Sequence, residues 1–116
     1  MASFRVKRVQ EEVLGFVSSL LRRYNDPDFS LVTLSECQMS PDLKNAYLYY
    51  TYFTPAESDE TKLGAKIAAD LDNVRAEIRK EVGAGLRLKF TPQIHFRFDD
   101  AAVFGSKIDR ILDQLK

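Results

Sequence analysis

Basic residues alternate with apolar ones between residues 86 and 99. The odd positions include Arg87, Lys89, His95 and Arg97, whereas the even positions carry Leu, Phe, Pro and Ile up to residue 98. Successive side chains of a β-strand point to opposite faces, so this alternation predicts one long strand with an apolar face and a cationic face. Arg and Lys pair with phosphate oxygens, which makes the cationic face a candidate surface for a nucleic acid. The ordinary alternative is a solvated outer strand face.

A helical segment in the middle of the chain carries a second group of basic residues. Arg75 and Arg79 are four positions apart, one turn apart on the same helix face, and Lys80 follows directly. Glu77 and Glu81 are close enough to pair with these side chains at helical spacing. Both a helix face that contacts RNA and a solvated face of ion pairs remain open.

The first helix carries a third basic group at its N-terminal end. Arg5, Lys7 and Arg8 lie in or near its first turn, where positive charge opposes the helix dipole. This unfavourable position suggests contact with a phosphate backbone. The competing interpretation is added solubility, which we favour for Arg5 and Lys7 but not for Arg8.

Aromatic side chains are concentrated between residues 43 and 53. Tyr47, Tyr49 and Phe53 share one face of the predicted strand, and exposed aromatic rings can stack on bases. A small sheet also needs its large side chains for packing. We therefore expect these three side chains to be buried or half-buried.

Residues for enzymatic chemistry do not converge in this sequence. His95 is the only histidine and Cys37 the only cysteine, which excludes an internal disulfide and a multi-cysteine zinc site and disfavours a nucleophile–base pair. Asp99 and Asp100 are adjacent, so their side chains point apart, and capping of a following helix explains them better than acid–base or Mg²⁺ chemistry. The glycine pair at positions 83 and 85 follows a helix, the reverse of a dinucleotide fingerprint. We expect no catalytic, metal-binding or cofactor-binding residues.

The overall composition restricts the class of protein but not its partner. The chain has 116 residues, 45% of them hydrophobic, with 17 basic residues, 17 acidic residues and a formal net charge of zero. No apolar run approaches the roughly 18 residues of a spanning helix, and the start of the chain does not resemble a signal peptide. We expect a cytoplasmic protein. Because nucleic-acid binders more often carry a basic excess, binding of this kind would depend on local segregation of charge.

Hydrophobic spacing predicts the order α-β-β-α-β-α, an α+β class with helices on one side of a small sheet. A turn at Ser40–Asp42 joins the first two strands as a hairpin. Ser58 is the expected N-cap of the middle helix, and the glycines from Gly83 to Gly85 are its expected stop. The predicted elements are helices over residues 5–23, 63–82 and 104–115 and strands over residues 31–39, 43–53 and 86–99.

This order and a series of short motifs resemble the ribosome-binding factor A family, bacterial assembly factors of the small ribosomal subunit. The resemblance covers essentially the whole chain. It rests on the order and spacing of motifs that are unspecific one by one. These motifs are Arg8-Val9, Asp26-Pro27, Met39-Ser40-x-Asp42-Leu43, Ala46, Tyr49, Ile78-Arg79, Leu86-Arg87-Leu88, Pro92, Phe96, Asp99, Gly105, Ile108 and Leu112.

The resemblance implies a type II KH-like fold, α-β-β-α-(kink)-α-β with a short C-terminal helix. In this family a small-residue Ala-x-Gly kink in the long middle helix replaces the phosphate-clamping GxxG loop of KH domains. The matching positions here are Val74-Arg75-Ala76, which lack the glycine. Many members carry a charged C-terminal tail. This chain ends directly after the last predicted helix, so we expect one KH-like domain over residues 1–116 without that tail.

The resemblance also implies a function. It predicts a non-enzymatic, monomeric factor that binds the free 30S subunit and its 16S rRNA and assists late assembly and 5′-end rRNA processing, with no cofactor and no membrane. The RNA-binding residues would be Arg8, Arg75, Arg79, Lys80, Arg87, Lys89 and Arg97.

The alternative is a protein–protein interaction module of the same fold without RNA binding. Separation of Arg8, Arg79 and Arg87 onto different surfaces, together with an exposed patch at Tyr47 and Tyr49, would favour that module. Convergence of the basic residues would favour RNA.

Overall fold

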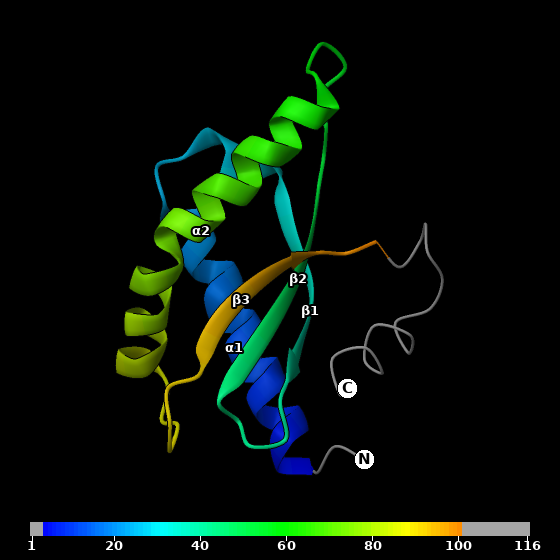
Figure 1. The fold of residues 1–116 in the computed structure, drawn as a ribbon. Helices are drawn as coiled ribbons and strands as arrows, with labels where there is room; N and C mark the ends of the chain where they lie inside the picture. Colours follow the sequence, from blue (N-terminus) through cyan, green and yellow to red (C-terminus); the bar gives the residue numbers. More distant parts are fainter. Residues whose placement is uncertain (1–3, 101–116) are drawn as a thin grey trace.

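The computed structural model describes residues 4–100, which form two long helices, one short 3-10 helix and three strands. Figure 1 shows their arrangement. The helix predicted over residues 104–115 lies outside the described residues. Along the chain the elements are α1 (Phe4–Arg23), η1 (Pro27–Leu31), β1 (Val32–Met39), β2 (Asn45–Tyr52), α2 (Glu60–Gly85) and β3 (Gln93–Phe98).

Strand β2 forms the centre of the sheet, with β1 and β3 on its two sides. β1 and β2 form the predicted antiparallel hairpin, and the Leu43 N–H donates to the Ser40 carbonyl oxygen at 2.9 Å in the turn between them. β3 runs parallel to β2 in a register that places Phe96 beside Leu48. Parallel neighbours need a crossover connection, and α2 provides it (Figure 1).

Both helices cover the same face of the sheet, and the core lies between the two layers (Figure 1). α1 packs mainly on β1, and α2 mainly on β3. The three-and-four spacing of apolar residues along α1 gives it one buried stripe, as predicted. The α+β class is therefore confirmed. Fully buried side chains from β2, α2 and β3 include Leu48, Ile67, Leu71, Ile78 and Ile94.

Helix α2 begins earlier than predicted, and it ends at Gly85, the last residue of the predicted stop. Its N-cap is Asp59, whose carboxylate accepts a hydrogen bond from the Lys62 N–H at 3.1 Å, whereas Ser58 belongs to the preceding turn. A carboxylate at this position also interacts favourably with the helix dipole. The helix continues through Gly83 to Gly85, because neither glycine adopts the left-handed conformation that ends many helices.

The middle of α2 contains the positions that match the family's kink. Helix is assigned without interruption through Val74-Arg75-Ala76. The ribbon nevertheless changes direction part-way along α2 (Figure 1). α2 is therefore one bent helix, and it is not divided into two helices at these positions, which lack a glycine.

The long strand predicted over residues 86–99 is wrong in its first half. Only Gln93–Phe98 forms a strand, and residues 86–92 form a loop between α2 and β3. Pro92 has no N–H to donate to a strand ladder, and its side chain is fully buried where the loop ends. Phe90, predicted to face the core, is 53% exposed. The alternation of the sequence thus extends beyond the strand.

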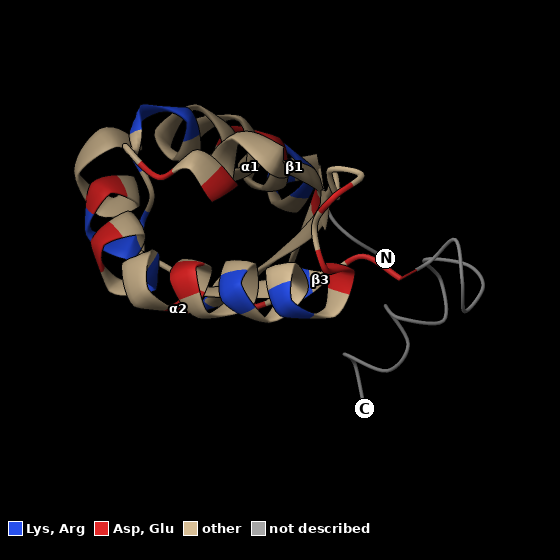
Figure 2. Cartoon of the chain, turned by 90° about the horizontal axis from the view of Figure 1, so that it is seen from above, with Lys and Arg blue, Asp and Glu red and all other residues tan. Residues whose placement is uncertain are grey.

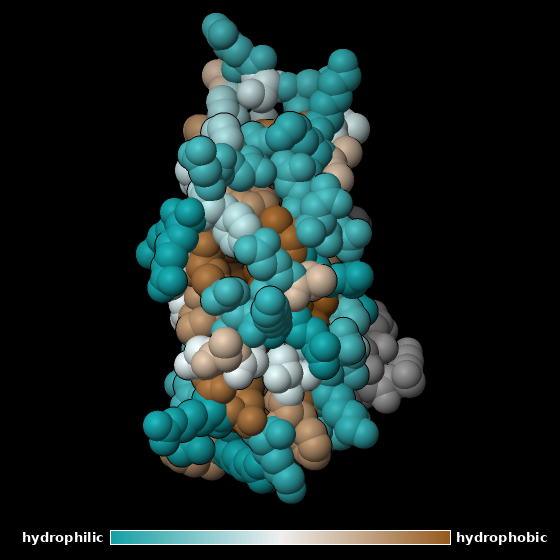
Figure 3. Space-filling model, turned by 90° about the vertical axis from the view of Figure 1, so that its left-hand side faces the viewer, coloured by the Kyte–Doolittle hydropathy of each residue, from teal (hydrophilic) through white to brown (hydrophobic). Residues whose placement is uncertain are grey.

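Charge is mixed on much of the molecular surface. Acidic and basic segments are interspersed along α2 (Figure 2). Figure 3 shows a face that is mostly hydrophilic, with hydrophobic atoms in the recesses between polar side chains. Among the described residues, no helix is long and apolar enough to cross a membrane. Any segregation of positive charge is therefore local.

Candidate nucleic-acid interface

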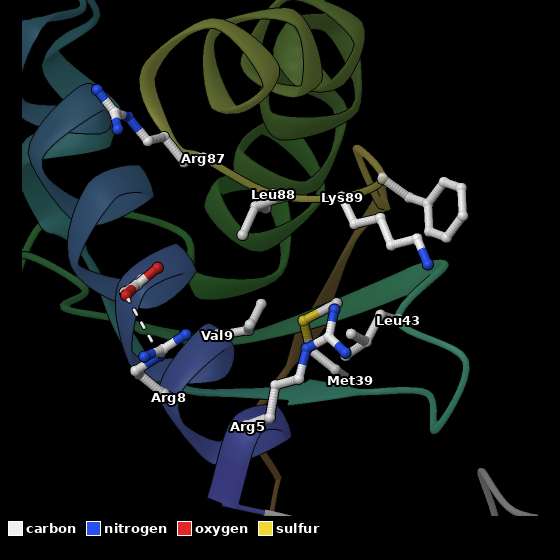
Figure 4. Close-up of a pocket in the computed structure, with 10 residues that line it drawn as sticks. Arg5, Arg8, Val9, Met39, Leu43, Arg87, Leu88 and Lys89 are labelled. Atoms are coloured by element: carbon white, nitrogen blue, oxygen red, sulfur yellow. Dashed lines mark ion pairs between the residues drawn. The ribbon is translucent and has the colours of Figure 1, made fainter.

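Basic side chains from distant parts of the chain line one cavity. It lies between the N-terminal part of α1 and the loop of residues 86–92, and its volume is about 100 Å³. α1 contributes Arg5 and Arg8, and the loop contributes Arg87 and Lys89 (Figure 4). We name this site the N-terminal cavity. The fold therefore brings together cations from the first helix and from the loop before the last described strand.

The floor of the N-terminal cavity is apolar. Val9, Met39, Leu43 and Leu88 contribute to it. Leu43 reaches it from the hairpin turn, where its φ of 63° is a left-handed conformation that is uncommon for leucine. Figure 4 shows Arg5 extending from α1 toward Met39 and Leu43. The cavity thus combines a cationic rim with an apolar floor.

Acidic groups compensate only part of the positive charge at this cavity. Glu12 also lines it, and the Glu12 Oε1 lies 3.9 Å from the Arg8 Nε. The side chains are 65% exposed for Arg8 and 45% exposed for Glu12, so this ion pair is weak. The Lys89 Nζ lies 5.6 Å from the centroid of the Phe90 ring, within the range of a cation–π contact. The balance of charge at the cavity remains positive.

A second cavity, of about 170 Å³, lies between α2 and β3. Its basic residues are Arg75 from α2 and Arg97 from β3, and His95 lies beside them. The Asp72 Oδ1 lies 3.6 Å from the Arg75 Nη2, in another exposed pair. We name this site the α2–β3 cavity. Aromatic side chains also line it, those of Tyr50 and Phe96.

A stack of side chains connects β2 and β3 next to this second cavity. The His95 and Tyr47 rings are stacked with their centroids 4.9 Å apart, and the Arg97 guanidinium carbon lies 4.4 Å from the Tyr47 centroid. The His95 Nε2 lies 2.9 Å from the Asn45 Oδ1. Burial, followed by the nearby charges of Arg75 and Arg97, lowers the pKa of His95. His95 is therefore neutral near pH 7, and Arg75 and Arg97 provide the positive charge here.

Arg79 interacts with the backbone of the protein itself. Its Nε donates to the Pro92 carbonyl oxygen at 3.2 Å, and its Nη2 donates to the Thr91 carbonyl oxygen at 3.1 Å. These bonds fix the end of the 86–92 loop against α2. Lys80 is exposed on α2 and lines neither of the two cavities. The fold thus places five of the seven predicted RNA-binding residues in the two cavities. Arg79 and Lys80 lie outside them.

The aromatic residues of β2 follow the prediction only in part. Tyr49 is 2% exposed and Tyr47 is half-buried, as expected. Phe53 is 68% exposed, contrary to the prediction, because β2 ends at Tyr52 and Phe53 lies beyond the sheet. Tyr47 and Tyr49 therefore do not form an exposed aromatic patch.

Three carboxylates approach one another near η1, and a lysine of α2 pairs with two of them. Oxygen atoms of Asp26, Asp28 and Asp70 lie within 4.8 Å of one another. The Lys66 ammonium contacts both Asp28 and Asp70, and hydrogen bonds to these two carboxylates, Asp28 foremost, raise the pKa of Lys66. Asp26 accepts a hydrogen bond from the Asp28 N–H at 2.9 Å as the N-cap of η1. The cluster links η1 to α2.

The alternating sequence pattern groups residues that the structure separates. It places Arg87 and Lys89 on the same face as His95 and Arg97, but the first pair lines the N-terminal cavity and the second pair the α2–β3 cavity. Pro92 is the signal that marks this boundary, because a proline inside an alternating run is typical of a strand end or an edge strand.

Two residues of the N-terminal cavity are missed by sequence reasoning. The alternation assigns Phe90 to the apolar face of a strand, and for Arg5 the sequence favours a role in solubility over contact with a phosphate backbone. Both line the cavity. No local pattern identifies them, because their proximity depends on how α1 and the loop pack together.

Comparison with known proteins identifies the family. The family model described as Ribosome-binding factor A matches residues 5–112. The chain belongs to the ribosome-binding factor A family. The ribosome-binding factor A of Geobacter sp. (strain M21) is 34% identical over 112 residues, which cover 96% of this chain and 90% of the relative. That of Levilactobacillus brevis is 34% identical over 116 residues, which cover 99% of this chain and 97% of the relative.

Solved structures of ribosome-binding factor A share the fold. The crystal structure of the Thermus thermophilus protein has a TM-score of 0.66 at 14% identity, and the match covers 79% of this chain and 93% of that chain. A homology model of the Thermus thermophilus protein, fitted into a cryo-EM map of its complex with 30S, has a TM-score of 0.62 at 17% identity, covering 79% and 92% of the two chains. The predicted KH-like fold is confirmed. Arg75, within the positions that match the family's kink, lines the α2–β3 cavity.

Proposed function

We propose that this protein binds the free 30S ribosomal subunit in the cytoplasm, contacts its 16S rRNA, and assists late assembly and 5′-end rRNA processing without being an enzyme. Its relatives are named for ribosome binding, and a Thermus thermophilus relative forms a 30S complex. On this proposal it acts as a monomeric placeholder. It holds rRNA helices in an immature arrangement through phosphate contacts and shape, and then leaves before translation.

The convergence of basic side chains is the observation that carries this proposal. Arg8 and Arg87 come from opposite parts of the chain and line one cavity, and Arg75 and Arg97 line another. Guanidinium groups bind phosphate oxygens in a bidentate manner, which suits contact with an RNA backbone. Two local clusters of this kind reconcile RNA binding with a formal net charge of zero.

The alternative, a protein interaction module without RNA binding, is less well supported. An exposed patch at Tyr47 and Tyr49 would favour it, but Tyr49 is 2% exposed and the Tyr47 ring contacts both His95 and Arg97. Separation of Arg8, Arg79 and Arg87 onto different surfaces would also favour it, but Arg8 and Arg87 line the same cavity. Only Arg79 is separated from the other two, because its guanidinium is hydrogen-bonded to backbone carbonyl oxygens of the protein.

Cosedimentation with purified 30S subunits across a salt series tests the proposal. Binding should weaken steeply as salt rises, because each phosphate contact releases counterions. Arg87→Glu and Arg97→Glu, one from each cavity, should each weaken binding and reduce its salt dependence. Lys62→Glu, an equal change of charge at an exposed position of α2 outside both cavities, is the matched control.

Two results would count against the proposal. The first is binding that is insensitive to salt and survives the paired Arg87→Glu and Arg97→Glu substitutions. The second is association with assembled ribosomes as strong as that with free 30S subunits. The processing role has its own readout, since cells depleted of the protein should accumulate 16S rRNA with an unprocessed 5′ end.

A further inference from the structure

We propose that the N-terminal cavity binds an unstacked nucleotide of single-stranded RNA, with its base against Phe90 and its phosphate near Arg5 and Lys89. This inference rests on the proposed function and adds a specific subsite to it. It assigns a base-contacting role to the loop between α2 and β3. A phosphate contact alone would require only the cationic rim, whereas the floor and the aromatic ring of this cavity are suited to a base.

The cavity wall combines cationic and apolar side chains. A phosphate site needs cations, and this cavity has them on both sides, Arg5 and Arg8 from α1 and Arg87 and Lys89 from the loop. Its floor is formed by side chains with no hydrogen-bonding groups, among them Val9. A nucleotide matches this combination because it carries an anionic phosphate next to a flat, largely apolar base.

Phe90 is highly exposed for a large apolar side chain. Phe90 is 53% exposed, whereas Leu86, Leu88, Ile94 and Phe96 of the same alternating run pack on the core and only Phe98, at the end of β3, is similarly exposed. A large apolar side chain in this position gains little for folding, since burial provides the stabilisation. An aromatic ring beside cations is the arrangement with which proteins bind unstacked bases. The Lys89 Nζ lies over the ring, 5.6 Å from its centroid, so a cation is next to the aromatic surface on which a base would stack.

The basic side chains of the loop point in different directions. Figure 4 shows Arg87 and Lys89 leaving the loop in different directions, with Lys89 on the same side as Leu43 and Met39. A single phosphate would not engage both. This divergence suits a strand whose successive phosphates pass across the loop, so that Arg87 contacts a neighbouring nucleotide. The Arg8–Glu12 pair is weak enough for Arg8 to exchange Glu12 for phosphate.

The occupant is therefore single-stranded RNA rather than a duplex or an acidic protein. In duplex RNA the base faces are stacked and inaccessible to a side chain such as Phe90. An acidic peptide would satisfy the cations but has no flat ring to place on Phe90. These two ligands give the contrasting outcomes of the test.

The chain contains no tryptophan, which makes a direct test possible. Phe90→Trp and Phe53→Trp each give a full-length protein with one tryptophan at an exposed aromatic position, 53% exposed for residue 90 and 68% for residue 53. Each variant is titrated with a short single-stranded oligoadenylate while tryptophan fluorescence is recorded. Binding is measured separately from the anisotropy of a labelled oligonucleotide. A base stacked on the ring should quench the tryptophan at position 90 and leave the one at position 53 unchanged.

An abasic oligomer with the same number of phosphates provides the chemical control. It should bind with little quenching at position 90, because it has charge and no base. Phe90→Leu keeps an apolar side chain and should weaken oligoadenylate binding about 5- to 100-fold. Phe53→Leu, the matched change at an exposed site outside the cavity, should leave binding unchanged.

Several outcomes overturn the inference. They are oligoadenylate binding without quenching at position 90, equal quenching by the abasic oligomer, and equal quenching by a polyglutamate peptide or by duplex RNA. If 30S cosedimentation and its salt dependence persist in these cases, the proposed function stands and only the base subsite is wrong. If the unmodified protein binds neither 30S subunits nor oligoadenylate, both proposals fail together.

Discussion

The Arg79 guanidinium donates a hydrogen bond from its Nε to the Pro92 carbonyl oxygen, at 3.2 Å. A second bond, from Nη2 to the Thr91 carbonyl oxygen at 3.1 Å, makes the contact a clamp. α2 thereby fixes the end of the loop that carries Arg87, Lys89 and Phe90. The family resemblance assigns Arg79 to RNA binding. In the structure it instead positions the loop residues that line the N-terminal cavity.

Replacement of Arg79 should therefore reduce stability. Arg79→Ala removes two hydrogen bonds from a half-buried charged group, and a typical hydrogen bond contributes about 0.5–1.5 kcal/mol net. We expect a loss of about 1–3 kcal/mol in the free energy of unfolding, measured by urea denaturation. The neighbouring Lys80→Ala is the control, since Lys80 is exposed, and it should change stability by less than about 0.5 kcal/mol. Equal effects of the two substitutions would argue against the clamp.

The fold could be predicted largely from local patterns. The spacing of apolar residues located α1 and α2, and the hairpin followed from two alternating segments with a turn at Ser40–Asp42. These features depend on neighbouring residues, so a single sequence contains them. The prediction of one long strand over residues 86–99 was wrong because alternation shows only which side chains are apolar. It does not show that a second strand is available to pair with residues 86–92.

The candidate site was less predictable because it depends on contacts between distant segments. Nothing near Arg79 in sequence indicates that its partners are the carbonyl oxygens of Thr91 and Pro92. Likewise, Arg5 and Phe90 line one cavity only because α1 and the 86–92 loop pack side by side. Sequence patterns gave the correct residue types and charges, and the packing determined which of them share a cavity.

Two glycines should respond to alanine in opposite directions. A Cβ at Gly85 would overlap the end of the Phe16 ring, so Gly85→Ala forces the ring or the end of α2 to move. We expect a loss of about 1–3 kcal/mol in unfolding free energy. A Cβ at Gly15 meets nothing within 4 Å, and Gly15 lies inside α1, so Gly15→Ala should stabilise by about 0.5–1 kcal/mol.

Urea denaturation of the two glycine variants and the parent protein measures both changes. The Phe16→Leu, Gly85→Ala double variant identifies the cause, because the smaller side chain should make the Gly85→Ala change less costly. If Gly85→Ala were neutral, the contact between α1 and the end of α2 would be looser than the structure shows.

Cys37 should be unreactive in the folded protein. Its side chain lies in the core at 4% exposure, and burial, followed by the charge of Glu36, raises the pKa of the thiol to about 12 from a reference of 9.0. Because the thiolate is the reactive form, at pH 8 this shift alone lowers its population by about a thousandfold. A chromogenic disulfide reagent should therefore label Cys37 slowly in buffer and rapidly in urea. Rapid labelling in buffer would mean that β1 opens readily.

His95 gives a pH dependence whose sign can be worked out. Its pKa is below the reference value of 6.5, because burial first, and the charges of Arg75 and Arg97 next, disfavour the protonated ring. The unfolded chain therefore binds more protons than the folded protein as pH falls through about 6.5 toward the lower folded pKa. The contribution of His95 to stability is complete above pH 6.5, decreases through this window, and is constant below the folded pKa.

The single histidine makes this prediction measurable, because its ring resonances in an NMR titration are unique. The folded protein should show a pKa below 6.5, and Arg75→Gln should raise it by removing a positive charge that faces the ring. Lys62→Gln, an equal loss of charge on α2 outside the α2–β3 cavity, should leave the titration unchanged. Bound RNA should shift the pKa upward, since a phosphate near Arg97 would favour the protonated ring. A titration that bound RNA does not alter would place the phosphates away from the α2–β3 cavity.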